Sequence, residues 1–405
     1  MKYGLLGRKL GHSYSPAIHS LLGDYEYCLF EKEPEGLADF LRHGDWDGLN
    51  VTMPYKKAVI SYLDEVTLVA QYVGSVNTIY RYNGNLVGHN TDFSGFYRML
   101  RRSGLEPKGK KCLVLGSGGA SQVAVQVLKE AGADVVVISR SGENHYGNLG
   151  LHSDAAIIVN TTPVGMYPDT GVSPVNLDLF PRLEGVLDVI YNPARTQLLI
   201  DAERCGLVAM NGLWMLVCQA REASTVMTCV PVPEEKAEEV YHILRRRMEN
   251  IILIGMPGCG KSTIGRLIAE ETGKIFVDSD AEIEKLARKS IPRIFAEDGE
   301  AAFRALETQV LAEWGKQSGL VIATGGGCVT EERNYPLLHQ NGTCIWLQRD
   351  VRKLPTDGRP LSVDLDELQR LRHPMYEAFA DTVIDNNGLP QASVAKIVAY
   401  WGELT

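Results

Sequence analysis

Short apolar runs alternate with longer helical patterns along the whole chain. The runs are rich in Val, Ile and Leu, with clear examples at 112–116, 134–139, 155–160, 251–255 and 344–347. Strands that alternate with helices in this way form βαβ units and parallel sheets. The pattern therefore predicts an α/β fold. A single amphipathic helical pattern ends only two residues before the run at 251–255, which indicates a domain boundary there without a flexible linker.

One apolar run passes directly into a turn of the form G-x-x-x-x-G-K-S, from Gly255 to Ser262, and a helical pattern follows. In such a loop the backbone N–H groups and the helix N-terminus bind phosphate oxygens. The lysine reaches the β- and γ-phosphates and the hydroxyl ligates Mg²⁺. The sequence therefore predicts an ATP and Mg²⁺ site that comprises Gly258, Cys259, Gly260, Lys261, Ser262 and Thr263.

A second glycine turn, GSGGAS at 116–121, also lies between an apolar run and a helical pattern. It fits a relaxed dinucleotide fingerprint, which a chance glycine-rich turn also fits. The next run ends at Arg140, where a basic side chain suits the 2′-phosphate of NADP, although an arginine exposed after a strand is common in any protein. We therefore expect NADP(H) to bind at Gly116, Ser117, Gly118, Gly119, Ala120 and Arg140.

Composition limits the class of protein. The 405 residues suggest two to three domains, and 45% hydrophobic with 22% charged residues is typical of a soluble globular chain. The net charge of −9 argues against a general nucleic-acid or anionic-membrane binder. Eight scattered cysteines without a C-x-x-C pair predict reduced thiols and a cytoplasmic protein without a disulfide framework or zinc site. Neither a signal peptide nor a membrane span is predicted.

Several polar clusters follow the phosphate loop: DSD at 278–280, FRALE at 303–307, GGG at 325–327, RPL at 359–361 and RHPMY at 372–376. Two arginines could bind a carboxylate, the glycines offer N–H groups at a strand end, and an aspartate could orient or deprotonate a hydroxyl. Each such residue alone is more often an ordinary surface residue.

Taken in order, these motifs resemble shikimate kinase over about residues 249–400. The resemblance implies that shikimate binds to Asp280, Arg304, Gly326 and Arg372. It also implies charge stabilisation by Lys261 and Arg359, Mg²⁺ binding by Ser262 and Asp278, catalysis through Asp280, and an adenine contact for Arg352. The resemblance also implies a lid that includes part of the stretch from Arg359 to Arg372. This stretch is shorter here than in the family.

The N-terminal part contains GHSYSP at 11–16, NVTMPYK at 50–56, VNT at 76–78, NTD at 90–92 and NGLWMLVCQA at 211–220. Each alone is explained equally well as turn chemistry. Together with the glycine turn they resemble shikimate dehydrogenase over about residues 1–245. This implies a split α/β substrate domain, 1–100 plus 212–248, with an inserted Rossmann-type NADP domain, 101–211. A P-loop kinase domain, 249–405, follows.

This second resemblance also implies residue roles. Lys56 and Asp92 form the catalytic pair, in which Lys56 donates a proton to the ketone oxygen. Gly212 and Met215 border the nicotinamide. The substrate is bound by Ser13, Ser15, Thr52, Asn77, Asp92, Tyr191 and Gln219. The segment between Arg140 and Asn160 is shorter than in the family, so a modest NADP preference is expected.

The two resemblances together imply a bifunctional enzyme of aromatic amino acid biosynthesis. It would reduce 3-dehydroshikimate to shikimate with NADPH and then phosphorylate shikimate with ATP. One alternative is a degenerate sensor that binds these metabolites without chemistry, although the catalytic residue types are all present. Another is a dehydrogenase that also accepts quinate, joined to a kinase for a different small hydroxyl compound. The oligomeric state is not predicted.

Overall fold

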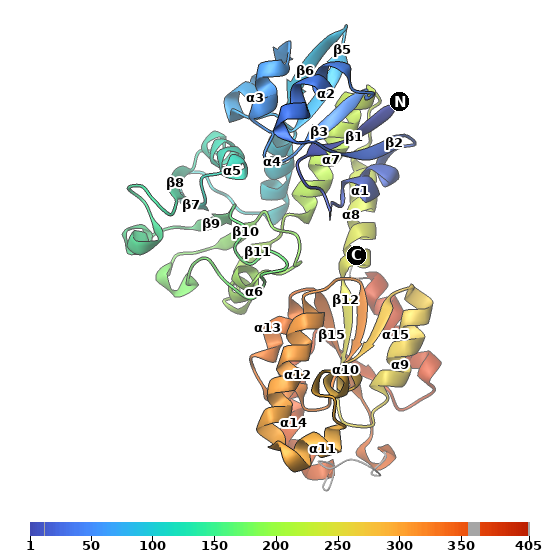
Figure 1. Ribbon diagram of the computed structural model, residues 1–405. Helices are drawn as coiled ribbons and strands as arrows, with labels where there is room; N and C mark the ends of the chain where they lie inside the picture. Colours follow the sequence, from blue (N-terminus) through green and yellow to red (C-terminus); the bar gives the residue numbers. More distant parts are fainter. Residues whose placement is uncertain (12, 355–364, 404–405) are drawn as a thin grey trace. The chain divides into compact units, whose positions relative to one another are not determined.

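The computed structural model describes residues 1–11, 13–354 and 365–403, and it contains three β-sheets (Figure 1). The α/β class expected from the alternating pattern is confirmed. The described residues group into two compact units. The first comprises 1–164, 173–191 and 201–244, and the second comprises 165–172, 192–200 and 245–405.

The first sheet has six strands in the order β2-β1-β3-β5-β6-β4. Its strands are β1 (Lys2–Gly7), β2 (Glu26–Glu31), β3 (Gly48–Val51), β4 (Glu65–Val66), β5 (Thr78–Tyr82) and β6 (Asn85–His89). The accompanying helices are α1 (Ser15–Leu22), α2 (Leu37–His43), α3 (Leu68–Val73), α4 (Asp92–Ser103), α7 (Leu213–Thr228) and α8 (Glu234–Met248). Helices α4 and α7 pack against each other.

This sheet is mixed and so departs from the parallel sheets that the alternating pattern predicts. Strand β5 runs antiparallel to both β3 and β6. The reversal between β5 and β6 is made by Asn83 and Gly84, which both have positive φ, 50° and 85°. A two-residue Asn-Gly turn of this kind matches the twist of a hairpin and makes neighbouring strands antiparallel.

The second sheet is entirely parallel, in the order β11-β10-β9-β7-β8. Its strands are β7 (Lys111–Leu115), β8 (Asp134–Ile138), β9 (Ile157–Asn160), β10 (Gly185–Asp188) and β11 (Val208–Met210), with helices α5 (Gly119–Glu130) and α6 (Gln197–Arg204). The short segment between β8 and β9 contains a 3-10 helix, Tyr146–His152. The side chain of His145 caps its N-terminus.

The third sheet is also parallel, in the order β13-β14-β12-β15-β16. Its strands are β12 (Asn250–Ile254), β13 (Ile275–Asp278), β14 (Leu320–Ala323), β15 (Gly342–Gln348) and β16 (Thr382–Asp385). Helices α9 (Lys261–Thr272) and α15 (Pro390–Glu403) cover one face (Figure 1). The other helices are α10 (Ser279–Ala287), α11 (Ile291–Glu297), α12 (Gly299–Gly315), α13 (Asn334–His339) and α14 (Leu365–Phe379).

The core of this last sheet explains its strand order. Residues 251–254 of β12 are all completely buried, and so are Val321 of β14 and Ile345 of β15. A strand that is covered by helices on both faces needs such a continuous apolar run, which is why β12 occupies the centre. The polar loops at the carboxyl ends of these strands are then free to form a binding site.

Two further findings concern the helices and the cysteines. Within the described ranges, no helix is both long and apolar enough to cross a membrane. All eight cysteines belong to those ranges and are free thiols.

Candidate active sites

A cavity of about 300 Å³ in the first unit brings together eleven of the residues singled out by sequence. They come from positions up to 206 residues apart, from the loop after β1 to helix α7. The predicted residues that line it are Ser13, Ser15, Thr52, Lys56, Asn77, Asp92, Ala120, Tyr191, Gly212, Met215 and Gln219. The cavity is therefore lined by both polar and apolar groups, and Met215 and Leu216 are among the apolar ones.

Lys56 and Asp92 form an ion pair in this cavity, with Nζ 2.6 Å from Oδ2. The two side chains are only 28% and 15% exposed, so solvent screens the pair incompletely. Asp92 is the first residue of α4, where the positive end of the helix dipole stabilises its carboxylate. The pair holds the Lys56 Nζ in one position beside the space that a ligand would fill.

A buried network fixes the amides around this pair. Asn77 donates from Nδ2 to Thr91 Oγ1 at 3.0 Å, and its Oδ1 accepts the Thr91 N–H at 2.8 Å. Thr91 Oγ1 in turn donates to Oε1 of Gln219 at 3.3 Å. Both the nitrogen and the oxygen of the Asn77 amide are hydrogen-bonded to Thr91. The orientation of this amide beside the cavity is therefore fixed.

Asn50 also lines the cavity, and sequence reasoning does not single it out. It is 6% exposed, accepts a hydrogen bond from the Tyr27 hydroxyl at 2.7 Å and donates to Thr78 Oγ1 at 3.2 Å. An asparagine inside the otherwise apolar strand Gly48–Val51 is the available sequence signal, since a buried polar side chain needs such partners.

The glycine turn after β7 has the form that a bound phosphate requires. Gly116 has φ of 105°, and a Cβ there would lie 2.9 Å from Thr161 Oγ1, so a side chain is excluded. A Cβ on Gly118 or Gly119 would meet no atom of the described chain within 4 Å, so the N-terminus of α5 is open to a ligand. Arg140 follows β8 and is exposed. These residues fit a dinucleotide.

A second cavity, of about 520 Å³, lies at the carboxyl ends of β12, β13 and β14 in the second unit. The predicted residues that line it are Gly258, Gly260, Lys261, Ser262, Thr263, Asp278, Asp280, Arg304, Gly326 and Arg372. Cys259 is completely buried, which leaves only its backbone for a ligand. Arg352 is 88% exposed and pairs with Asp350 at 2.7 Å. Arg359 lies outside the described residues.

The phosphate loop is wound around the Lys261 ammonium. Its Nζ donates to the carbonyl oxygens of Gly255 at 2.8 Å and Met256 at 3.0 Å, and the residue is 8% exposed. Gly255, Gly258 and Gly260 all have positive φ, between 80° and 141°. Only glycine adopts these conformations readily, and they turn the loop N–H groups toward one point.

Ser262 and Asp278 lie side by side next to this loop. The hydroxyl of Ser262 donates to Asp278 Oδ2 at 2.6 Å. A hydroxyl and a carboxylate are oxygen ligands of the kind that Mg²⁺ prefers. Both residues also line the cavity, so the donor set fits a magnesium ion bound together with phosphate.

Two buried arginines also line this cavity. Arg304 Nη1 contacts Glu307 Oε2 at 2.7 Å, with 6% and 0% of the side chains exposed. Burial raises the pKa of Glu307, while Arg304 counteracts part of that rise. Arg372, 7% exposed, donates to the Gly326 carbonyl at 3.0 Å. Both guanidinium groups are therefore held in fixed positions. Glu307 follows Arg304 by three residues on α12, but its complete burial cannot be read from the sequence, so sequence reasoning misses it as a site residue.

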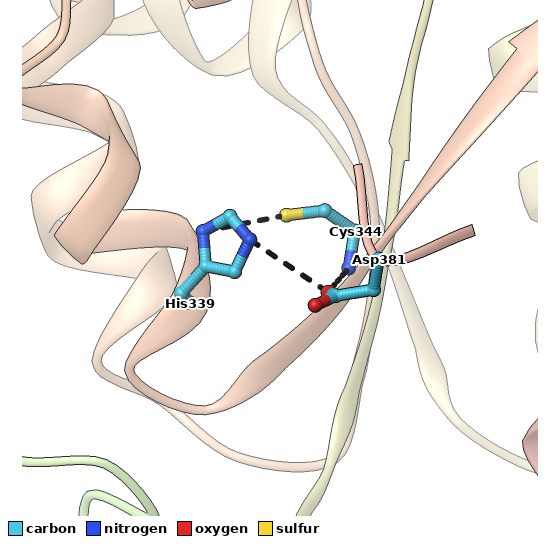
Figure 2. A group of neighbouring side chains, drawn as sticks. All are labelled: His339, Cys344 and Asp381. Carbon is cyan, nitrogen blue, oxygen red and sulfur yellow. Dashed lines mark hydrogen bonds and ion pairs between the residues drawn. The ribbon is translucent and has the colours of Figure 1, made fainter. Parts of the chain in front are cut away.

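His339, Cys344 and Asp381 form a separate cluster, shown in Figure 2. The Cys344 Sγ is 3.8 Å from Nδ1 of His339, whereas Asp381 Oδ2 is 3.7 Å from Nε2. Nδ1 also lies 2.9 Å from the carbonyl oxygen of Tyr335. A metal ion binds one imidazole nitrogen, but here the sulfur and the carboxylate approach different nitrogens. We therefore interpret the group as a hydrogen-bonded packing cluster.

Comparisons with known families match both parts of the chain. Residues 5–79 match the model of the shikimate dehydrogenase substrate binding domain, and residues 257–401 match the model of shikimate kinase. A shikimate dehydrogenase (NADP(+)) of Clostridium perfringens is 34% identical over 267 residues. That match covers 60% of this chain and 98% of the relative.

Solved structures of shikimate dehydrogenases are also similar to this chain, over about 60% of its length. A chorismate mutase/shikimate 5-dehydrogenase fusion protein from Clostridium acetobutylicum is 36% identical, with a TM-score of 0.58, over 96% of its length. Shikimate 5-dehydrogenase from Thermus thermophilus, solved in complex with NADP(H) and shikimate, is 32% identical, with a TM-score of 0.55, over 99% of its length.

Proposed function

Because the chain belongs to the shikimate dehydrogenase family and continues into a shikimate kinase domain, we propose that it catalyses two successive reactions. The first reduces 3-dehydroshikimate to shikimate with NADPH, and the second phosphorylates shikimate with ATP and Mg²⁺ to 3-phosphoshikimate. The substrate domain would comprise 1–100 and 212–248, the NADP domain 101–211 and the kinase domain 249–405. The three sheets support this division, since β1–β6, β7–β11 and β12–β16 each fall within one of these parts.

The observation that carries the first reaction is the Lys56–Asp92 pair inside a cavity lined by hydroxyl and amide groups. NADPH bound at the glycine turn supplies a hydride to the ketone carbon. Lys56 donates a proton from Nζ to the ketone oxygen, where negative charge develops. Asp92 holds the ammonium and accepts a hydrogen bond from a substrate hydroxyl. Ser13, Ser15, Asn77 and Gln219 then bind the carboxylate and remaining hydroxyls.

The second reaction depends on charge and orientation. Arg304 and Arg372 bind the shikimate carboxylate through forked hydrogen bonds. Asp280 orients the acceptor hydroxyl and accepts its proton, while Lys261 neutralises charge on the transferring phosphoryl group. Ser262 and Asp278 would hold Mg²⁺, which would neutralise part of the charge on the phosphates. Arg352 is assigned to the adenine and Arg359 to the phosphoryl group on family resemblance.

Steady-state assays test the proposal. Shikimate and quinate are offered as substrates with NADP and with NAD, and ATP-dependent phosphorylation of shikimate is followed separately. We expect oxidation of shikimate with NADP and phosphate transfer to shikimate. A chain that binds shikimate without turning it over in either assay would instead be a metabolite sensor, and a higher kcat/KM for quinate would change the assigned substrate.

Cofactor choice gives one specific prediction. Arg140→Asp should raise KM for NADP by about 10-fold, because a charge-assisted contact with the 2′-phosphate becomes a repulsion. KM for NAD should change little, since NAD lacks that phosphate. Dehydrogenase kinetics with both cofactors measure this, and Arg42→Asp, at another exposed arginine, is the matched control. An equal rise for both cofactors would mean that Arg140 does not contact the 2′-phosphate.

The glycine triplet gives another prediction. A Cβ on Gly327 would overlap the Arg304 guanidinium, although the Gly327 backbone, with φ of −108°, accepts alanine. Gly327→Ala should therefore displace Arg304 without unfolding the domain and raise KM for shikimate by about 10-fold or more in the kinase assay. Gly388→Ala, where a Cβ meets no described atom within 4 Å, should leave that KM unchanged. An unchanged KM in Gly327→Ala would remove Arg304 from the proposed carboxylate site.

A further inference from the structure

Arg349 lies beside the phosphate loop although no motif assigns it a role. It follows β15, which pairs in parallel with β12 through Ile254 and Trp346. The chain after β15 therefore runs next to the glycine loop that follows β12. A Cβ built on Gly260 would lie 3.8 Å from the Arg349 Nη1. The guanidinium is thus adjacent to the N-terminus of α9.

The Arg349 side chain has no internal partner within the described parts of the chain. Its Nε is buried and makes no hydrogen bond there, and no carboxylate of those residues pairs with its guanidinium. The carboxylate of the neighbouring Asp350 forms an ion pair with Arg352 instead, with Oδ2 2.7 Å from Nη2. A buried donor without an acceptor costs free energy, so an acceptor supplied from beyond the described residues would stabilise this side chain.

Electrostatics define the class of that partner. The N-terminus of α9 carries the positive end of the helix dipole, and Lys261 adds a full positive charge to the same loop. An unpaired guanidinium at this place is repelled by both. An anion bound on the loop would reverse the sign of the interaction and supply acceptors for a forked donor.

We infer that Arg349 binds the phosphate chain of the nucleotide held by the glycine loop. The inference rests on the proposed kinase function and adds a binding residue to it. Arg352 differs, because it is highly exposed and already paired with Asp350. Arg349 is thus a phosphate-binding residue that reaches the loop from the adjacent strand, and its effect should be on nucleotide affinity more than on shikimate affinity.

The test measures binding of ADP to the full chain by calorimetry and inhibition of the kinase reaction by inorganic tripolyphosphate and by adenosine. Arg349→Ala should weaken the binding of ADP and the inhibition by tripolyphosphate by about 10-fold each. Inhibition by adenosine should not change. Arg349→Lys, which keeps the charge and much of the stem, should recover part of the loss and guards against misfolding of the alanine variant. Arg333→Ala, at an exposed arginine paired with Glu331, is the matched control.

Each outcome decides the inference. Affinities of Arg349→Ala within twofold of the wild type would overturn it, and so would an equal loss for adenosine, which would assign Arg349 to the base instead of the phosphates. In both cases the wild-type chain still phosphorylates shikimate, so the proposed function stands. A wild-type chain that neither binds ADP nor phosphorylates shikimate would overturn the proposed function and this inference together.

Discussion

Replacing Lys261 with alanine is expected to abolish phosphoryl transfer while leaving NADPH-dependent reduction unchanged. The Lys261 Nζ is buried inside the phosphate loop, hydrogen-bonded to the Gly255 and Met256 carbonyls. Removing a preorganised charge from a site where negative charge develops lowers kcat by roughly 10²–10³-fold. Among the described residues, the dehydrogenase cavity is lined by the first unit alone, so its rate should not change.

The measurement compares both activities in one preparation. Shikimate phosphorylation and shikimate oxidation are assayed for the wild type, for Lys261→Ala and for Lys285→Ala. Lys285 is 75% exposed and lies on α10, so its loss should affect neither activity. A kinase rate in Lys261→Ala close to that of the wild type would contradict the assignment of the glycine loop as the site of ATP.

Replacing Lys56 with alanine is expected to have the opposite effect. The dehydrogenase rate should fall by roughly 10²–10⁴-fold, the usual consequence of removing a general acid. Asp92 would also lose the cation that lies 2.6 Å from its carboxylate, so a small further loss of substrate affinity is expected. Phosphorylation of added shikimate should remain, because the described lining of the kinase cavity comes entirely from the second unit.

Lys57→Ala is the matched control for this variant, since Lys57 is the next residue and is exposed. It should retain full dehydrogenase activity. If Lys56→Ala lost kinase turnover of added shikimate while remaining folded, the two sites would depend on each other. If it kept its dehydrogenase rate, Lys56 would not be the proton donor.

Much of the fold could be predicted from local pattern. The apolar run at 251–255 corresponds to β12, and the glycine turn after it begins where the strand ends. Hydrophobic periodicity works here because parallel strands are buried on both faces. Hydrophobic periodicity does not predict the antiparallel hairpin of β5 and β6, because its signal is the Asn83-Gly84 turn and not the apolar pattern.

Some residues of the candidate sites can likewise be predicted from the sequence, whereas others cannot. Loop residues such as Lys261 are predictable because the motif is contiguous in sequence. The partners Arg304 and Glu307 are three residues apart on α12, yet only burial reveals how tightly they are paired. Asn50 and Arg349 could not be found, because their roles depend on neighbours 23 and 89 residues away. The polar residue within an apolar strand marks Asn50 as unusual, but the partners of both side chains are set by the fold and cannot be read from the sequence.

The most direct test follows the two reactions through one chain. 3-Dehydroshikimate, NADPH, ATP and Mg²⁺ are supplied together, and shikimate and 3-phosphoshikimate are quantified over time by mass spectrometry. The wild type should form 3-phosphoshikimate, Lys261→Ala should accumulate shikimate, and Lys56→Ala should form neither product at a comparable rate. An equimolar mixture of the two variants should restore 3-phosphoshikimate. If the wild type stopped at shikimate, or if the mixture failed although each variant kept its remaining activity, the account of two independent, successive active sites would be contradicted.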